Sequence, residues 1–161
     1  MKRHFLFSAL LFFLVNSGAF QCQTLTVKID SGKQVVLNRS DLEALPHAKV
    51  TASEHSSSPV NFEDVTLKSV LEKAGVTFGE SMKGKRLTNC LLVEAADGYR
   101  AVIALPELDP AFTDKQMLLA FLRDGKPLGE KEGPYRIVIP DEKRMARWVR
   151  QVTTLKIVDV Q

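Results

Sequence analysis

Apolar and polar residues alternate along several short stretches of the chain, and this two-residue period is typical of β-strands that bury one face. Leu25, Val27 and Ile29 alternate with polar residues, and the turn-forming run 30–33 leads to a second apolar stretch at 34–37. The pattern predicts a β-hairpin at the start of the folded domain.

Further apolar stretches indicate more strands, several of them joined by Asp-Gly turns. They are residues 47–54, 90–93, 99–104, 117–122, 136–139 and 155–160. The run from Cys90 to Val93 is apolar at every position, so we expect a central strand that is covered on both faces. Strands therefore dominate, and most neighbouring strands are expected to be antiparallel.

Two segments carry helix signals. Thr66 precedes an apolar stripe with the period of a helix, and Gly75 stands where that helix would end. Ser40 and Glu43 have the spacing of a capping box, which predicts a short helix that stops at Pro46. The expected fold class is therefore α+β, with a mixed, mostly antiparallel sheet and a few short helices.

Residues 1–19 have the features of a secretory signal peptide. A basic start precedes the apolar run 5–15, and small side chains at Ser17 and Ala19 suit signal peptidase. The apolar run is too short to span a bilayer. We expect cleavage after Ala19, a single domain over residues 20–161, and a periplasmic or secreted product without a membrane span.

The chain has two cysteines, Cys22 and Cys90. In an oxidising compartment they predict a disulfide that ties the N-terminus to a strand. A buried free thiol at Cys90 is the alternative, because the sequence alone gives no geometry for the pair. Lipid modification of Cys22 is a further alternative, although Gln21 is not the small residue that such processing prefers.

Charge and motifs exclude several classes of function. Without Lys2 and Arg3, the formal net charge of +3 falls to about +1, so no broad basic surface for nucleic acid is expected. The sequence has no CxxC pair, no HxxxH spacing and no glycine-rich phosphate loop.

Five segments follow one another in the second half of the chain with a recognisable order and spacing. They read VTLKSVLEKAGV (65–76), VEAADGYRAVIALPEL (93–108), LLAFLRDGKPL (118–128), GPYRIVIP (133–140) and RWVRQVTTLKI (147–157). Together they resemble the molybdopterin-binding domain of the sulfite-oxidase family. The resemblance implies that fold and a pyranopterin cofactor whose dithiolene sulfurs hold molybdenum, with a protein cysteine thiolate as a further soft ligand.

The chain departs from this family at the metal. The family's cysteine lies upstream of the helix that matches 65–76, but residues 50–58 contain no cysteine, which puts molybdenum in doubt. His55, on the serine-rich loop near that position, is a candidate to contact the cofactor, and the alternative is a solvated side chain. Cys90 lies in an apolar run, where a structural thiol or disulfide is the common outcome.

The resemblance also implies an anion site. In the family the arginine of the segment that matches 133–140 helps to hold the cofactor's phosphate, and this arginine is Arg136 here; Arg147 stands where the family has a lysine before the tryptophan. Glu132 takes the place of a family histidine, and its carboxylate would repel a phosphate. The alternative is an ion-paired Arg136 and a core role for Trp148.

Two hypotheses for the function follow. The first is an exported oxidoreductase-like domain that binds a molybdopterin and meets a periplasmic redox partner protein. The second is a non-catalytic binding or partner-docking module on the same fold. Arg136 and Arg147 are compatible with the first hypothesis, while the missing cysteine and Glu132 favour the second. The sequence leaves enzyme activity open.

Overall fold

The computed structural model describes residues 23–29, 32–54 and 58–160, and these residues form two β-sheets with helices between and around them. The first sheet has the strand order β2-β1-β10-β5-β6. Its strands are β1 (Leu25–Lys28), β2 (Gln34–Leu37), β5 (Asn89–Ala95), β6 (Arg100–Ala104) and β10 (Val152–Asp159).

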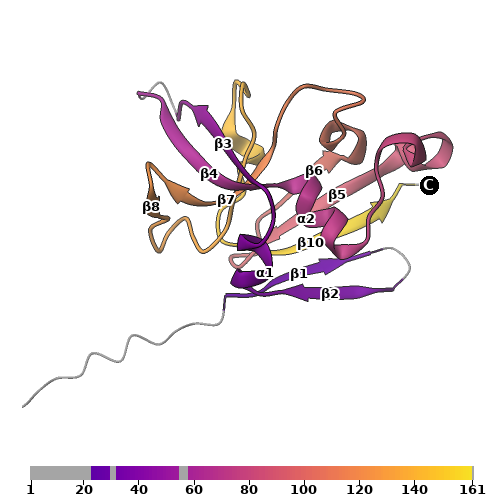
Figure 1. The fold of residues 1–161 in the computed structure, drawn as a ribbon, viewed down its shortest axis with the longest axis horizontal. Coiled ribbons are helices and arrows are strands. Elements are labelled where there is room, and N and C mark those ends of the chain that lie inside the picture. The colour runs from indigo at the N-terminus through magenta and orange to yellow at the C-terminus, as the bar shows by residue number, and fades with distance from the viewer. Residues whose placement is uncertain (1–22, 30–31, 55–57, 161) are drawn as a thin grey trace, which may run out of the picture.

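The second sheet has the order β3-β4-β7-β8, and β9 also pairs with β7. Its strands are β3 (His47–Ala52), β4 (Val60–Thr66), β7 (Leu118–Arg123), β8 (Lys126–Pro127) and β9 (Arg136–Val138). Figure 1 shows this sheet on the left and the first sheet at the lower right. The segment after β9 leads from the second sheet back into the first, as β10.

Strand pairing is antiparallel in both sheets except between β1 and β10, which run parallel with Val27 opposite Leu155. The predicted α+β class with a mixed, mostly antiparallel sheet is therefore confirmed. The first predicted hairpin is present as β1 and β2, with Leu25 opposite Leu37.

The helices are short. The α-helices are α1 (Arg39–Glu43) and α2 (Leu67–Ala74), and the 3-10 turns are η1 (Gly79–Ser81), η2 (Gly84–Thr88), η3 (Leu105–Leu108) and η4 (Met145–Arg147). The prediction for α2 is confirmed at both ends: the Thr66 hydroxyl accepts a hydrogen bond from the Ser69 amide, and Gly75 ends the helix at φ +104°. The apolar stripe of α2 is buried.

Two local predictions were wrong. The helix α1 is capped by Asn38, whose side chain accepts from the Asp41 amide while Asp41 accepts from the Asn38 amide. This capping box lies two residues before the predicted one at Ser40 and Glu43. The strand β4 was not predicted, because a register shift between Glu63 and Asp64 breaks its alternation of apolar and polar residues.

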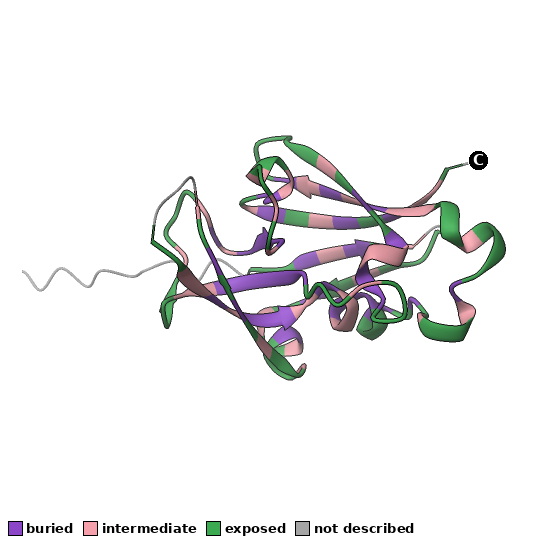
Figure 2. Cartoon of the chain, turned by 90° about the horizontal axis from the view of Figure 1, so that it is seen from above, coloured by how far each residue is buried: buried purple, intermediate pink, exposed green. Residues whose placement is uncertain are grey.

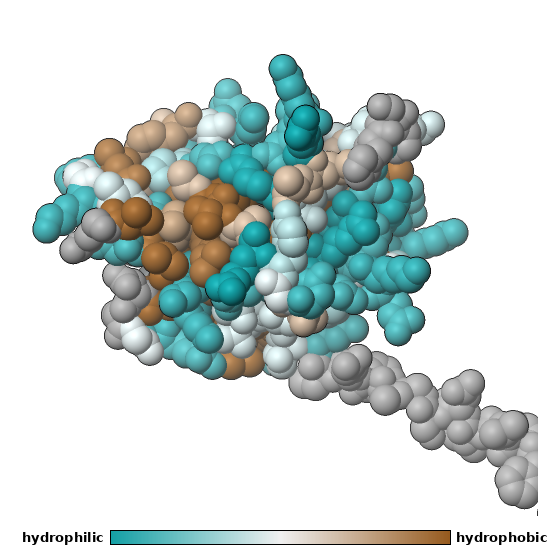
Figure 3. Space-filling view, turned by 180° about the vertical axis from the view of Figure 1, so that it is seen from behind, coloured by the Kyte–Doolittle hydropathy of each residue, from teal (hydrophilic) through white to brown (hydrophobic). Residues whose placement is uncertain are grey.

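The strand β5 is central in its sheet, but only one of its faces is fully covered. Leu91 and Val93 are buried, while Cys90 and Leu92 on the other face are half-buried (Figure 2). The prediction that both faces are covered was therefore wrong. From behind, apolar side chains gather in one patch on the side where the first sheet lies (Figure 3), and Val102 of β6 is half exposed.

In the part of the chain that the structure describes, no helix has the length and apolar character that a membrane crossing requires.

Candidate functional site

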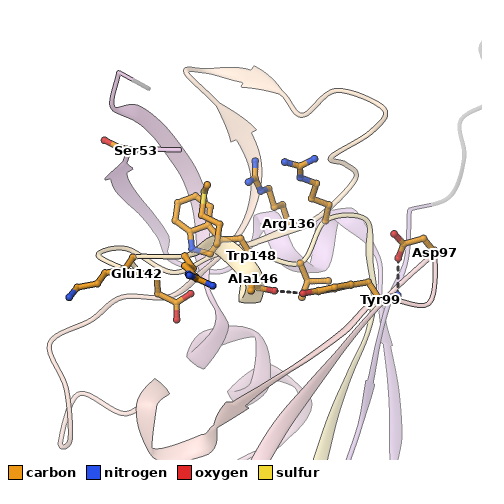
Figure 4. A pocket seen from close by; sticks show the side chains of 12 residues that line it. Ser53, Asp97, Tyr99, Arg136, Glu142, Ala146 and Trp148 are labelled. Atoms are coloured by element: carbon orange, nitrogen blue, oxygen red, sulfur yellow. Dashed lines mark hydrogen bonds between the residues drawn. The ribbon is translucent and has the colours of Figure 1, made fainter. Parts of the chain in front are cut away.

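A cavity of about 700 Å³ lies where the β5–β6 hairpin meets the segment between β9 and β10. The hairpin contributes Asp97 and Tyr99, and Ser53, just after β3, contributes from the second sheet. Residues 142–146 and 148–150 supply most of the remaining wall. In the close view of Figure 4, Ser53 and Glu142 lie on one side of Trp148 and Tyr99 lies on the other.

Backbone and side-chain hydrogen bonds hold the basic segment against the sheets. The Ile137 amide of β9 donates to the Val149 carbonyl at 2.8 Å, and the Trp148 indole N–H donates to the Ile139 carbonyl at 2.9 Å. The Tyr99 hydroxyl donates to the Ala146 carbonyl at 2.7 Å. Because its only polar atom is already bonded, the indole of Trp148 presents an apolar surface to the cavity.

Arg136 lines this cavity and is almost fully buried, with 1% of its side chain exposed. Its Nη2 pairs with Glu54, and its Nη1 lies 2.9 Å from Oε1 of Glu132. Arg123 joins the same two carboxylates, at 2.9 Å from Glu54 and 3.4 Å from Glu132. Two cations and two carboxylates thus form a cluster in which the formal charges balance.

Burial lowers the pKa of the Arg136 guanidinium, and the charges of Glu54 and Glu132 oppose this shift. The guanidinium also lies over two aromatic rings, 5.3 Å from the centroid of Phe62 and 5.4 Å from that of Trp148. These contacts are within the range of cation–π attraction. The carboxylates and rings therefore offset part of the effect of burial, and they hold the guanidinium in place within the protein.

Arg147 lies outside the cavity wall and is held by a second pair of carboxylates. Its Nε donates to Oε1 of Glu142 at 2.8 Å, its Nη2 pairs with the same atom, and its Nη1 lies 3.1 Å from Glu107. Burial acts to lower the pKa of Arg147, but the hydrogen bonds to Glu107 and Glu142 outweigh it and raise the pKa. Glu142 faces the cavity, so Arg147 anchors a wall residue.

Three other cations line the cavity without a carboxylate partner. Lys143, Arg144 and Arg150 are exposed, and their side chains form no ion pair or hydrogen bond with residues 23–29, 32–54 or 58–160. The charge of Arg150 also acts on Arg136 and lowers its pKa. Of the two acids in the wall, Glu142 is already paired with Arg147, which leaves Asp97. The wall therefore carries an excess of positive charge, as a site for an anion requires.

Of the predicted site residues that the structure describes, one lines this cavity. Arg136 lines it, while Arg147 lies behind its wall. His55 and Cys22 lie outside the described residues, so the cofactor contact of His55 and the disulfide between Cys22 and Cys90 stay predictions. Cys90 is a free thiol on β5 whose pKa is raised by burial, and it does not line the cavity.

Sequence reasoning missed most of the cavity wall. Lys143, Arg144 and Arg150 belong to the mixed-charge run 141–150, in which only Arg147 was predicted as a site residue. The signal that could have identified them is the clustering of three basic residues around the single tryptophan, Trp148. Tyr99 carried no such signal, because only the tertiary fold brings the hairpin to this segment.

Comparisons with known proteins place the fold. Residues 36–161 match the family model described as oxidoreductase molybdopterin binding domain. Among solved structures, the chain is similar to the sulfane dehydrogenase SoxCD from Paracoccus pantotrophus, with a TM-score of 0.66 and 20% sequence identity. The similarity covers 85% of this chain but 38% of the SoxCD chain, so it shows the fold of one part of that larger enzyme. A search among curated protein sequences found no match.

Proposed function

Since the chain belongs to the oxidoreductase molybdopterin-binding domain family, we propose that its cavity binds a phosphate-bearing pterin of the molybdopterin type. The observation that carries this proposal is a set of three cations around the apolar indole of Trp148, namely Lys143, Arg144 and Arg150, which have no carboxylate partner in the part of the chain that the structure describes. A pterin phosphate combines a flat heterocycle with an anion, and these are the two features that such a wall accommodates.

The basic and the aromatic residues of the wall have different roles in this proposal. Arg150 and its basic neighbours hold the phosphate through charge-assisted hydrogen bonds. Trp148 and Tyr99 provide apolar surface for the heterocycle and exclude water from it. A molybdopterin supplies dithiolene sulfurs for metal binding and electron transfer when it is bound.

The described residues do not fit a metal centre of the family's kind. Within them, no group of three or more His, Cys, Asp or Glu side chains could hold a metal ion. Cys90 does not line the cavity, and the carboxylate of Glu142 is held by Arg147. The free cations of the wall would also repel a metal cation. We therefore propose a pterin site without a cysteine ligand for molybdenum.

The proposal extends to the setting of the protein. The signal-like residues 1–19 support export to the periplasm or outside the cell. A redox partner protein is the partner that the family membership supports for a loaded domain. The second candidate function is a non-catalytic binding or partner-docking module, and the neutralised Arg136 favours it, because this cation is satisfied by Glu54 and Glu132.

The test is cofactor analysis of the protein isolated from the periplasm of a host that makes molybdopterin. Pterin released and oxidised to its fluorescent form should be near one equivalent, with molybdenum well below one equivalent by elemental analysis. Absence of pterin would overturn the binding proposal and favour the docking module. One equivalent of molybdenum would overturn the proposal that the site lacks a metal ligand.

A pair of variants locates the site. Arg150→Ala should weaken pterin retention by about 1.5–3 kcal/mol, because it removes a charge-assisted contact. Arg100→Ala removes an exposed arginine of β6 outside the cavity wall and should leave retention unchanged. Equal retention by both variants would remove Arg150 from the site.

A further inference from the structure

Glu54 forms an ion pair with Arg136, a residue of the cavity wall. It follows Ser53, which lines the cavity just beyond the end of β3, and its side chain is 13% exposed. Its Oε1 pairs with Nη2 of Arg136, and its Oε2 lies 2.9 Å from Nη2 of Arg123. A carboxylate of the chain thus lies against the most deeply buried cation of the wall.

The contacts of Arg136 leave little for a ligand. One terminal nitrogen pairs with Glu54 and the other with Glu132, so that Nε is the guanidinium nitrogen without a hydrogen-bond partner among the described residues. An incoming phosphate would approach a guanidinium that already carries two carboxylates. The negative charges of the phosphate and of the two carboxylates would repel one another, and burial strengthens this repulsion.

The two carboxylates have different origins. Glu132 lies four residues before Arg136, in the segment that leads into β9, and it is not a wall residue. Glu54 comes from the second sheet, next to the wall residue Ser53. Neither carboxylate belongs to a wall residue, but Glu54 directly follows the wall residue Ser53, which makes it the one to test against a ligand in the cavity.

We propose that Glu54 is a specificity-determining residue: its carboxylate takes the place at Arg136 that an anionic group of a ligand would otherwise take. The anion of the ligand is then held by Arg150, Arg144 and Lys143, and ligands with a second anionic group are disfavoured. This inference rests on the proposed function only in taking the cavity as the ligand site. In this proposal the anion that pairs with Arg136 is a side chain of the protein and not a group of the ligand.

The test is a gain of affinity. Glu54→Gln keeps the size of the side chain and removes its charge, so inorganic pyrophosphate should bind the variant about five- to tenfold more tightly than the wild-type protein, as measured by isothermal titration calorimetry. Glu63→Gln is the matched control, because Glu63 lies on the adjacent strand β4 and pairs with the exposed Lys49 at 3.0 Å. The affinity of Glu63→Gln for pyrophosphate should equal that of the wild-type protein. An unchanged or weaker affinity in folded Glu54→Gln would overturn the proposal.

A second measurement needs no variant, and it applies even if Glu54→Gln fails to fold. In the wild-type protein, pyrophosphate should shift the Nε–H resonance of Arg150 in a nitrogen–proton correlation spectrum and leave that of Arg136 in place. A shift of Arg136 as large as that of Arg150 would contradict the occupancy by Glu54.

The two proposals fail separately. If the wild-type protein carries no pterin but Glu54→Gln gains affinity for pyrophosphate, the role of Glu54 stands and the proposed function fails. If pterin is present and Glu54→Gln gains nothing, the cofactor proposal stands and the role of Glu54 is overturned.

Discussion

The Tyr99 hydroxyl lies 2.7 Å from the carbonyl oxygen of Ala146 and donates a hydrogen bond to it. Tyr99 belongs to the hairpin of the first sheet, and Ala146 lies in η4, within the basic segment that follows the second sheet. The bond therefore joins the two parts of the chain that enclose the cavity. The shape of the cavity depends on it.

We expect Tyr99→Phe to weaken ligand binding and to lower the free energy of unfolding by about 0.5–1.5 kcal/mol, the usual contribution of one hydrogen bond. Tyr135→Phe is the matched control, because its hydroxyl donates to the Gln23 carbonyl at 2.8 Å and Tyr135 does not line the cavity. Urea denaturation and pterin retention should show that both variants lose stability and only Tyr99→Phe loses retention. Equal retention would show that the bond is not needed for the site.

Arg136→Met should destabilise the fold strongly. Removal of this buried cation takes from Glu54 and Glu132 the guanidinium that both of them pair with, and a broken buried ion pair typically costs about 3–5 kcal/mol. Adding Glu54→Gln to Arg136→Met should restore part of the loss, because it removes one of the two carboxylate charges that Arg136 had balanced. Urea denaturation of the single and double variants measures this coupling, and a loss below about 1 kcal/mol for Arg136→Met would contradict the buried cluster.

Asp64 makes stability depend on pH in the acid range. Burial raises the pKa of this carboxyl, although hydrogen bonds from the Phe121 and Leu122 amides and the charges of Arg39 and His47 oppose the shift. A folded-state pKa above the unfolded value of 3.8 means that the folded protein binds the proton more tightly. The free energy of unfolding contributed by Asp64 therefore falls as the pH rises from about 3.8 through the folded-state pKa, and the cost remains at neutral pH.

We accordingly expect Asp64→Asn to be more stable than the wild-type protein at pH 7, with a difference that shrinks below the unfolded pKa. Asn keeps the acceptor for the Phe121 amide and has nearly the same size and shape as Asp, so the backbone at φ +143° need not change. Thermal unfolding between pH 3 and 7 measures the effect. A variant that is less stable than the wild-type protein at pH 7 and equally stable at low pH would show that the ionised carboxylate stabilises the fold.

Trp148 offers a direct optical readout, since the chain has one tryptophan. The indole is 5% exposed, so its emission should be shifted to short wavelength and should resist quenching by acrylamide. A bound heterocycle against the indole should quench this emission in the wild-type protein. At the same ligand concentration Arg150→Ala should show much weaker quenching. Full exposure of the indole to acrylamide in the folded protein would contradict the packing of Trp148.

Local signals predicted local structure well. The helix α2 was identified at both ends because its cap, its apolar stripe and its terminal glycine are all contained in its own sequence. In α1 two capping patterns overlap, and the sequence could not show that Asn38, immediately after β2, is the residue that leaves the strand and begins the helix. The strand β4 escaped detection because the bulge at Asp64 interrupts its pattern.

The site could be predicted only in part. Arg136 was identified because it lies in a short apolar strand that also resembles a known family. Its carboxylate partner Glu54 comes from the end of a distant strand, so the neutralisation of Arg136 is a property of the tertiary fold. The same is true of the hairpin that carries Tyr99 to the basic segment.

The parallel pairing of β1 with β10 fixes when this protein can fold. Thr26 lies opposite Thr154, so one of the earliest strands of the chain is completed by the last one, and β10 is also the middle strand of its sheet. During synthesis the first sheet cannot close until β10 has left the ribosome, which leaves β1 and β5 without the strand that joins them until then. The second sheet does not contain β10, so its strands can pair before the first sheet is complete.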